Sequence, residues 1–124
     1  MHSEIRTVAI VEDDQLVRSA TASLLRSLGL DAACFESPLE LLEAPTTTLG
    51  CIVSDYHMPN MSGLELNDVL RRRGMRIPFI LMTAYPTEQL RKRAIETGIL
   101  IVLDKPGEPE ELIAWLATIF GPFE

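Results

Sequence analysis

The sequence predicts a doubly wound α/β fold, in which helices cover both faces of a five-stranded parallel sheet. Five short apolar runs alternate strictly with five stretches of helical pattern along the 124 residues. Such alternation is typical of a parallel sheet buried on both faces. Right-handed crossovers leave few topologies for it, and the flavodoxin-like strand order 2-1-3-4-5 is favoured.

The first half of the chain contains two strands and two helices. The predicted strands and helices are 7–11, 15–29, 31–35 and 37–44. The helix at 15–29 has apolar residues at a spacing of four, which predicts a buried stripe of Leu16, Ala20, Leu24 and Leu28. Gly29 suits its C-cap. Ser37 and Pro38 favour an N-cap followed by the first position of the next helix.

The second half of the chain continues the alternation. The predicted elements are strands at 50–55, 77–82 and 100–103, and helices at 62–74, 86–98 and 108–120. Ser62 is the expected N-cap of the first of these helices. Pro86 and Gly98 bound the second, whose apolar face is thin. The last helix carries an apolar stripe of Leu112, Leu116, Ile119 and Phe120.

Composition narrows the class of protein. A net charge of −7 argues against a nucleic-acid-binding surface, which requires an excess of basic residues. Cys34 and Cys51 lack metal-binding spacing and are expected to be reduced core residues. The chain shows neither a signal peptide nor an apolar run long enough to span a membrane. We therefore expect residues 1–124 to form a single soluble, cytoplasmic domain with a core at about 5–120.

Acidic side chains follow several of the predicted strands. Glu12 and Asp13 come directly after the first strand, and Asp55 ends the third. Because carboxyl ends of parallel strands meet at one edge, and strands one and three are neighbours, these acids are expected to lie within several ångströms of one another. Asp14, in contrast, is expected to cap the following helix. Lys105 follows the fifth strand and reaches the same edge.

This group of charges predicts a metal-assisted phosphoryl acceptor. Clustered carboxylates repel, so either one is protonated or a cation is bound. Carboxylate, carbonyl and water oxygens suit Mg²⁺. A carboxylate of Asp55 can attack phosphorus, and Mg²⁺ together with Lys105 would neutralise the transferred oxygens. Thr83, which follows the fourth strand, can donate a hydrogen bond to one of them. We expect Lys105 to pair with Asp55 when no phosphoryl group is present.

These motifs resemble the response regulator receiver domain of two-component signalling. The resemblance covers about residues 5–120. It depends on the acid pair after the first strand, "DYHMPNMSG" around Asp55, "LMTA" with Thr83, and "DKP" with Lys105, each at a strand end. The segment "LMTAYP" is most similar to the nitrogen-fixation regulators of this family.

The resemblance implies a role for each matching residue. Asp55 would be the phosphoacceptor, phosphorylated by a histidine kinase or phosphotransfer protein. Asp13, Asp55 and the backbone carbonyl of His57 would bind Mg²⁺ directly, and Glu12 through water. Thr83 and Lys105 would contact the phosphoryl group. The list of implied site residues is therefore Glu12, Asp13, Asp55, His57, Thr83 and Lys105. The resemblance also implies a Lys105–Pro106 peptide bond that is often cis.

The resemblance further implies a switch and not an enzyme that turns over external substrates. Its chemistry would be Mg²⁺-dependent phosphotransfer to itself, followed by autodephosphorylation. The fourth helix and the last strand and helix would form the surface for an output domain, a partner protein or a homodimer, with no direct contact to nucleic acid or membrane.

One residue departs from the family pattern. Val102 stands three residues before the lysine, where the family usually carries an aromatic ring that moves upon phosphorylation. This departure supports an alternative, a constitutive interaction module that keeps the fold without using phosphate. A phosphatase of the haloacid dehalogenase type is rejected, because His57 stands where such enzymes need a second aspartate.

Overall fold

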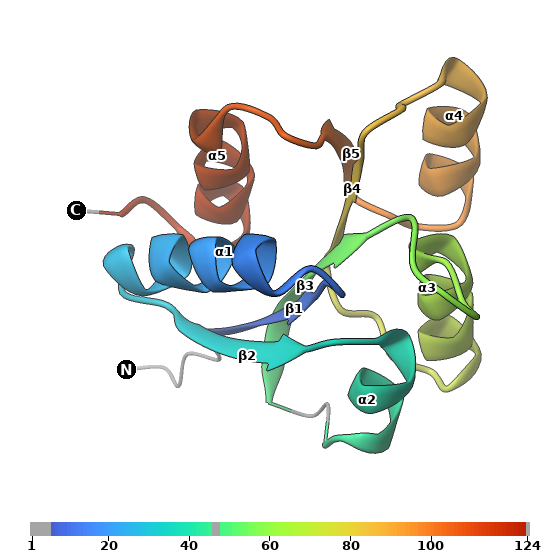
Figure 1. The fold of residues 1–124 in the computed structure, drawn as a ribbon, viewed down its shortest axis with the longest axis horizontal. Coiled ribbons are helices and arrows are strands. Elements are labelled where there is room, and N and C mark those ends of the chain that lie inside the picture. The colour runs from blue at the N-terminus through green and yellow to red at the C-terminus, as the bar shows by residue number, and fades with distance from the viewer. Residues whose placement is uncertain (1–5, 46–47, 124) are drawn as a thin grey trace.

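Strands and helices alternate along the whole described chain (Figure 1). The computed structural model describes residues 6–45 and 48–123, so the predicted core boundary at residue 5 lies outside the described residues. The strands are β1 (Thr7–Val11), β2 (Asp31–Phe35), β3 (Leu49–Asp55), β4 (Phe79–Thr83) and β5 (Ile101–Asp104). The helices are α1 (Gln15–Ser27), α2 (Pro38–Glu43), α3 (Gly63–Arg72), α4 (Glu88–Glu96) and α5 (Pro109–Phe120). The predicted alternation is confirmed.

The strands form a parallel sheet in the order β2-β1-β3-β4-β5, as predicted. The register aligns their carboxyl ends. Val11 pairs with Ser54, and Asp55 pairs with Met82. Thr83 in turn pairs with Asp104. The residues that directly follow β1, β3, β4 and β5 therefore come to one edge of the sheet.

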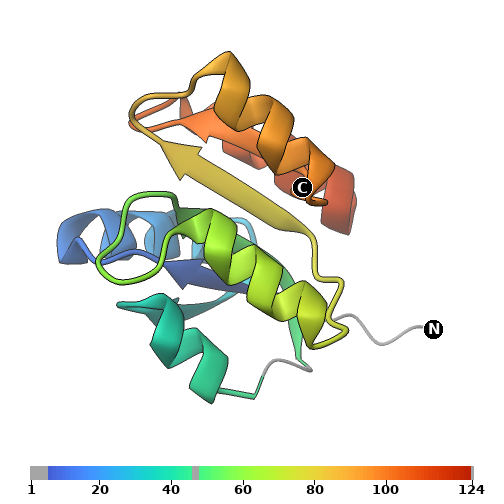
Figure 2. The same cartoon turned by 90° about the vertical axis from the view of Figure 1, so that its right-hand side faces the viewer.

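Helices cover both faces of the sheet. α1 and α5 lie on one face, whereas α2, α3 and α4 lie on the other (Figures 1 and 2). Successive strand residues alternate between the two layers: Ile52 packs with α3 residues, and Val53 packs with α1 and α5 residues. This alternation explains the continuous apolar runs of the central strands, since helices cover both of their faces.

The predicted apolar stripe of α1 is wrong in part. Leu16 is 83% exposed and Ala20 is also exposed, while the buried residues of the helix are Ala22 and Leu25. In a helix of 3.6 residues per turn, a spacing of four drifts by about 40° at each step. The four residues of that stripe therefore spiral around the helix instead of sharing one face.

Helix caps agree closely with the sequence. Ser37 and Ser62 are N-caps whose hydroxyls accept hydrogen bonds from Glu40 N and Glu65 N, respectively. Asp14 caps α1 by accepting from two backbone N–H groups of the first turn. The boundaries differ by only one or two residues at several places; β4, for example, begins at Phe79 and not at residue 77.

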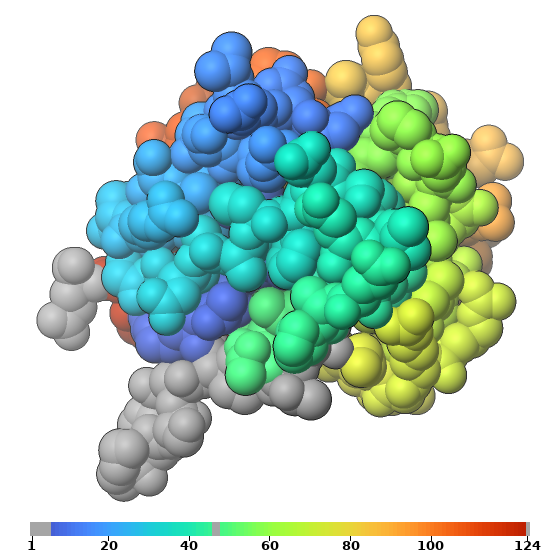
Figure 3. All heavy atoms as spheres, turned by 60° about the horizontal axis from the view of Figure 1, so that its bottom comes forward, coloured from blue at the N-terminus to red at the C-terminus, as the bar shows by residue number. Residues whose placement is uncertain are grey.

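The two cysteines differ in environment. Cys51 is fully buried, but Cys34 is exposed, which corrects the expectation that both lie in the core. Cys34 belongs to β2, one of the two edge strands of the sheet. Figure 3 shows the cyan and teal atoms of β2 and α2 at the surface of the molecule. None of the helices within residues 6–45 and 48–123 has both the length and the apolar character of a membrane span.

Candidate functional site

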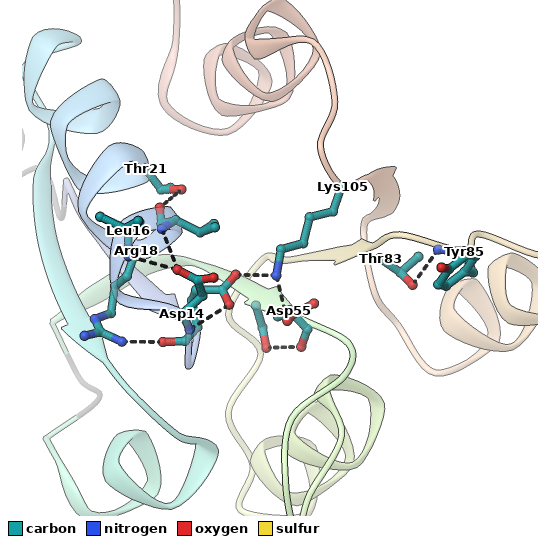
Figure 4. A network of polar contacts seen from close by, with 11 residues as sticks. Asp14, Leu16, Arg18, Thr21, Asp55, Thr83, Tyr85 and Lys105 are labelled. Carbon is teal, nitrogen blue, oxygen red and sulfur yellow. Dashed lines mark hydrogen bonds and ion pairs between the residues drawn. The ribbon is translucent and has the colours of Figure 1, made fainter.

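The acidic group at the sheet edge is held by backbone geometry. Glu12 directly follows β1, and its N–H donates to Phe35 O of β2 at 3.0 Å. Its own carbonyl accepts from Arg18 Nη1 of α1 at 2.7 Å. Asp55 is the last residue of β3 and is only 7% exposed. The edge of the sheet therefore positions both acids, and Arg18 of α1 also holds the backbone of Glu12; Figure 4 shows Arg18 and Asp55.

Lys105 joins the two buried acids. Its Nζ lies 2.7 Å from Glu12 Oε1 and 2.8 Å from Asp55 Oδ2. The expected pairing of Lys105 with Asp55 is thus confirmed, and its second partner is Glu12. The carboxylate side chains of both acids are only 7% exposed, so these charge-assisted hydrogen bonds lie largely out of water. Figure 4 shows the Lys105 side chain reaching from the end of β5 to Asp55.

The pKa values of Glu12 and Lys105 are both raised in the folded protein. Burial raises the pKa of Glu12 above its ordinary value of 4.5, since desolvation outweighs the hydrogen bonds from Lys105 and Asp14 N. Burial lowers the pKa of Lys105, but its two carboxylate partners outweigh that effect and raise it above 10.5. The two pKa values are raised for different reasons. Lys105 has two carboxylate partners, whereas Glu12 is buried and shares its one cation with Asp55.

The acids are close enough to bind one metal ion. Carboxylate oxygens of Glu12, Asp13 and Asp55 all lie within 4.8 Å of one another, as the sequence predicted. Oxygens on opposite sides of a Mg²⁺ ion are about 4.2 Å apart, because each bond is about 2.1 Å. Small side-chain movements would therefore bring these oxygens into bonding distance of one ion. Both oxygens of Glu12 already accept hydrogen bonds, from Lys105 Nζ and Asp14 N, which suits a contact through water. The donor set fits Mg²⁺.

Gly63 allows the first turn of α3 to approach Asp55. A Cβ atom at this position would lie 2.6 Å from Asp55 O and 2.5 Å from Leu81 Cδ1, both too close for van der Waals contact. Gly63 N donates to Tyr56 O at 3.1 Å, and Ser54 Oγ donates to Asp55 O at 2.9 Å. The strand end that carries the acid is therefore held between β4 and α3.

Among the described residues, the side chains of Thr83 and His57 do not join the ion pairs of Lys105. Thr83 is fully buried at the end of β4, and its Oγ1 accepts from Tyr85 N at 3.2 Å. The carbonyl of Thr83 accepts from Lys105 N at 2.9 Å, which ties β4 to the residue that carries the ammonium. His57 is exposed, and its ring packs edge-on against Tyr56 with centroids 4.7 Å apart. Its imidazole lies outside the metal-binding group formed by the described residues.

A groove leads to the site from the side of α1 and α5. Its volume is about 560 Å³, and it is lined mainly by apolar groups of the two helices and of the β5–α5 connection. Val17, Leu24, Leu112 and Lys105 are among the residues that line it. The peptide bond between Lys105 and Pro106 is cis, as the resemblance implied.

Several contacts have no signature in the sequence. Arg18 supports the Glu12 backbone, and Arg91 of α4 donates to Val102 O of β5 at 2.8 Å. A long side chain that binds a distant carbonyl follows no spacing rule. The small residue at Gly63 was a detectable signal, since a glycine at a helix start often marks a close backbone approach.

Comparison with known proteins agrees with this geometry. The family model for the response regulator receiver domain matches residues 8–117. The transcriptional regulatory protein TdiR of Thauera aromatica is 38% identical over 108 residues, which cover 86% of this chain and 48% of TdiR. FixJ of Azorhizobium caulinodans is 36% identical over 115 residues, which cover 92% of this chain and 54% of FixJ. The chain spans about half the length of these curated relatives.

Solved structures support the same assignment. FixJ-N has a TM-score of 0.80 at 30% identity, covering 98% of this chain and 95% of that one. StyR has a TM-score of 0.84 at 33% identity, covering 92% of this chain and 58% of that one. Phosphorylation and Mg²⁺ are typical of this family, whose members act in general as signalling switches. The chain, with its flavodoxin-like sheet and its acids gathered around one lysine, belongs to the response regulator receiver domain family of two-component systems.

Proposed function

We propose that this chain is a phosphoacceptor switch and that Asp55 receives its phosphoryl group from a phosphohistidine of a histidine kinase or phosphotransfer protein. The observation that carries the proposal is the Lys105 ammonium, which lies 2.7 Å from Glu12 Oε1 and 2.8 Å from Asp55 Oδ2. A partly buried ammonium at this place lies beside the proposed nucleophile and remains beside the group that the carboxylate would receive.

The transfer itself requires little beyond positioning. A carboxylate oxygen of Asp55 attacks phosphorus, the P–N bond to the donor imidazole breaks, and its electron pair returns to the ring nitrogen. Lys105 then exchanges a carboxylate partner for a phosphoryl oxygen. The Thr83 hydroxyl, which accepts from Tyr85 N, keeps its proton to donate to another phosphoryl oxygen. Lys105 is among the residues that line the groove between α1 and α5, and we propose that the donor approaches from this side.

Mg²⁺ is the proposed cofactor. Asp13, Asp55 and the backbone carbonyl of His57 would hold it directly, with Glu12 acting through water. When bound, the ion neutralises charge on the phosphoryl oxygens. The close carboxylates favour this role, because their mutual repulsion decreases when a divalent cation binds.

The wider setting follows from the family. We propose that residues 1–124 act as one receiver domain in the cytoplasm, and that the α4 face together with β5 and α5 contacts an output domain, a partner protein or a second copy. The phosphorylated state would decay by hydrolysis of the aspartyl phosphate, so the protein is not an enzyme that turns over external substrates.

Acetyl phosphate tests the proposal directly. With Mg²⁺ present, mass spectrometry should show a gain of about 80 Da, the mass of one phosphoryl group. Asp55→Asn should abolish the adduct. Asp14→Asn is a matched control at a neighbouring acid, since asparagine caps a helix as well as aspartate does, and it should keep the adduct. An adduct that survives Asp55→Asn would refute the assignment of the acceptor.

A constitutive interaction module is the second candidate, and one observation favours it. Val102 is 2% exposed in the core beside α4, where its small side chain has no ring to move when phosphate arrives. In this case the wild-type protein would bind its partner equally well with and without acetyl phosphate. A phosphate-dependent change in partner binding would exclude this second candidate.

A further inference from the structure

α4 is attached to the rest of the molecule by few contacts. Ala94 is its one buried residue, and the apolar contact of Leu90 with the core is partial. Polar contacts hold the residues just after the helix: Asn67 Nδ2 donates to Thr97 O at 2.9 Å, and Arg71 Nη2 donates to Gly98 O at 3.0 Å. The C-terminal end of α4 is thus tied to α3, whereas the body of the helix depends on other contacts.

Arg91 connects the body of α4 to β5. Its Nη1 donates to Val102 O at 2.8 Å, and its Nη2 lies 3.7 Å from Asp104 Oδ1. The guanidinium therefore spans two positions on one strand, as its planar, forked group of donors permits. Figure 2 shows α4 lying alongside β5. The ion pair with Asp104 is largely exposed and is expected to be weak, so the stronger contact is the one with the Val102 carbonyl.

The strand held by Arg91 is also the strand that carries the site lysine. Asp104 and Lys105 are consecutive, and Lys105 N donates to Thr83 O at 2.9 Å. A movement of the Lys105 ammonium from Glu12 and Asp55 toward a phosphoryl group therefore acts on the same short stretch of chain that Arg91 binds.

We propose that Arg91 is a positioning residue that couples α4 to the phosphoacceptor site through the end of β5. This inference rests on the proposed function of Asp55. Without phosphate, Arg91 holds α4 against β5. When Lys105 turns toward a phosphoryl group, the end of β5 shifts, the contacts of Arg91 weaken, and α4 is released. Because such coupling is reciprocal, a partner that binds the released helix would also favour the phosphorylated state.

Hydrogen exchange of the α4 amides, measured on the full chain with and without acetyl phosphate and Mg²⁺, tests the coupling. In the wild-type protein, phosphorylation should speed exchange in α4 by about tenfold, the effect of losing one hydrogen bond to a charged group. Arg91→Ala should show the fast exchange already without phosphate and little further change with it. Arg91→Lys keeps the positive charge but loses the forked donors of the guanidinium, so it should behave similarly. This substitution is expected to disturb folding less than Arg91→Ala.

Lys92→Ala is the matched control, because Lys92 is an exposed cation at the next position of the same helix. It should keep the wild-type response. Mass spectrometry of each sample reports the phosphoryl adduct separately. If the adduct forms and α4 of both Arg91 variants responds to phosphate as the wild type does, the coupling is refuted while the function of Asp55 stands. If the wild type forms no adduct, the proposed function fails and the coupling fails with it.

Discussion

Replacing Lys105 by methionine should destabilise the protein strongly at neutral pH without divalent metal. The substitution removes the one ammonium that contacts both Glu12 and Asp55, and it leaves two carboxylates that are each 7% exposed. Methionine retains the apolar stem of the lysine, so the loss of packing is small. The measured effect should therefore report the cost of two adjacent buried charges.

Two independent estimates of that cost agree. Carboxylate oxygens that lie within 4.8 Å of each other repel by at least about 3.5 kcal/mol at an effective dielectric constant near 20. If Glu12 instead takes up a proton at neutral pH, a group with an ordinary pKa of 4.5 requires about 3.4 kcal/mol, and less when burial raises its pKa. We expect a loss of about 2–3 kcal/mol in the free energy of unfolding.

Urea unfolding with a chelator present measures this loss. Lys92→Met is a matched control, because Lys92 is the other lysine of the chain and is exposed; it should lie within about 0.5 kcal/mol of the wild type. Mg²⁺ should restore much of the stability of Lys105→Met, since it also neutralises the acids. A Lys105→Met protein as stable as the Lys92→Met control would refute the reasoning.

Three further predictions concern other parts of the chain. Because the pKa of Glu12 is raised in the folded state, the folded protein binds the extra proton, and stability should fall as pH rises from 4.5 through the folded pKa. Glu12→Gln should flatten this part of the profile in pH-dependent unfolding, and an unchanged slope would contradict the assignment. Gly63→Ala should cost about 1–3 kcal/mol by overpacking against Asp55 O and should shift the NMR signals of the Asp55 loop. Unshifted signals would exclude the close approach. Burial raises the pKa of the Cys51 thiol to about 12, so iodoacetamide should modify Cys34 alone in the folded protein and both cysteines after unfolding, as mass spectrometry would show. Rapid double modification of the native protein would contradict this.

The position of the acids was predictable from the sequence because it follows from sheet topology. Because β1 and β3 are neighbouring parallel strands, Glu12 and Asp55 at their carboxyl ends must lie at a common edge of the sheet. Lys105 follows from the same rule, since β5 ends at that edge too. Such inferences need only the order of strands and the residue after each one, both of which the alternation of apolar runs provides.

Contacts between side chains and distant backbone were not predictable. The apolar spacing of α1 predicted that a helix forms but did not predict which face is buried. Leu16 and Leu25 are equally apolar, and only packing distinguishes them. Arg91 could equally have been a solvated residue of a basic helix. Its contact with Val102 O depends on the distance between α4 and β5, which no local pattern encodes.

The shared lysine also determines which ions the edge of the sheet can attract. Three carboxylates and one ammonium give this spot a formal charge of −3 + 1 = −2. A monovalent ion from the surrounding salt balances half of it, whereas one divalent ion balances all of it. The charge of the arrangement therefore favours a divalent ion before any preference for coordination geometry acts, and potassium or sodium salts at high concentration should screen the spot without matching that balance of charge.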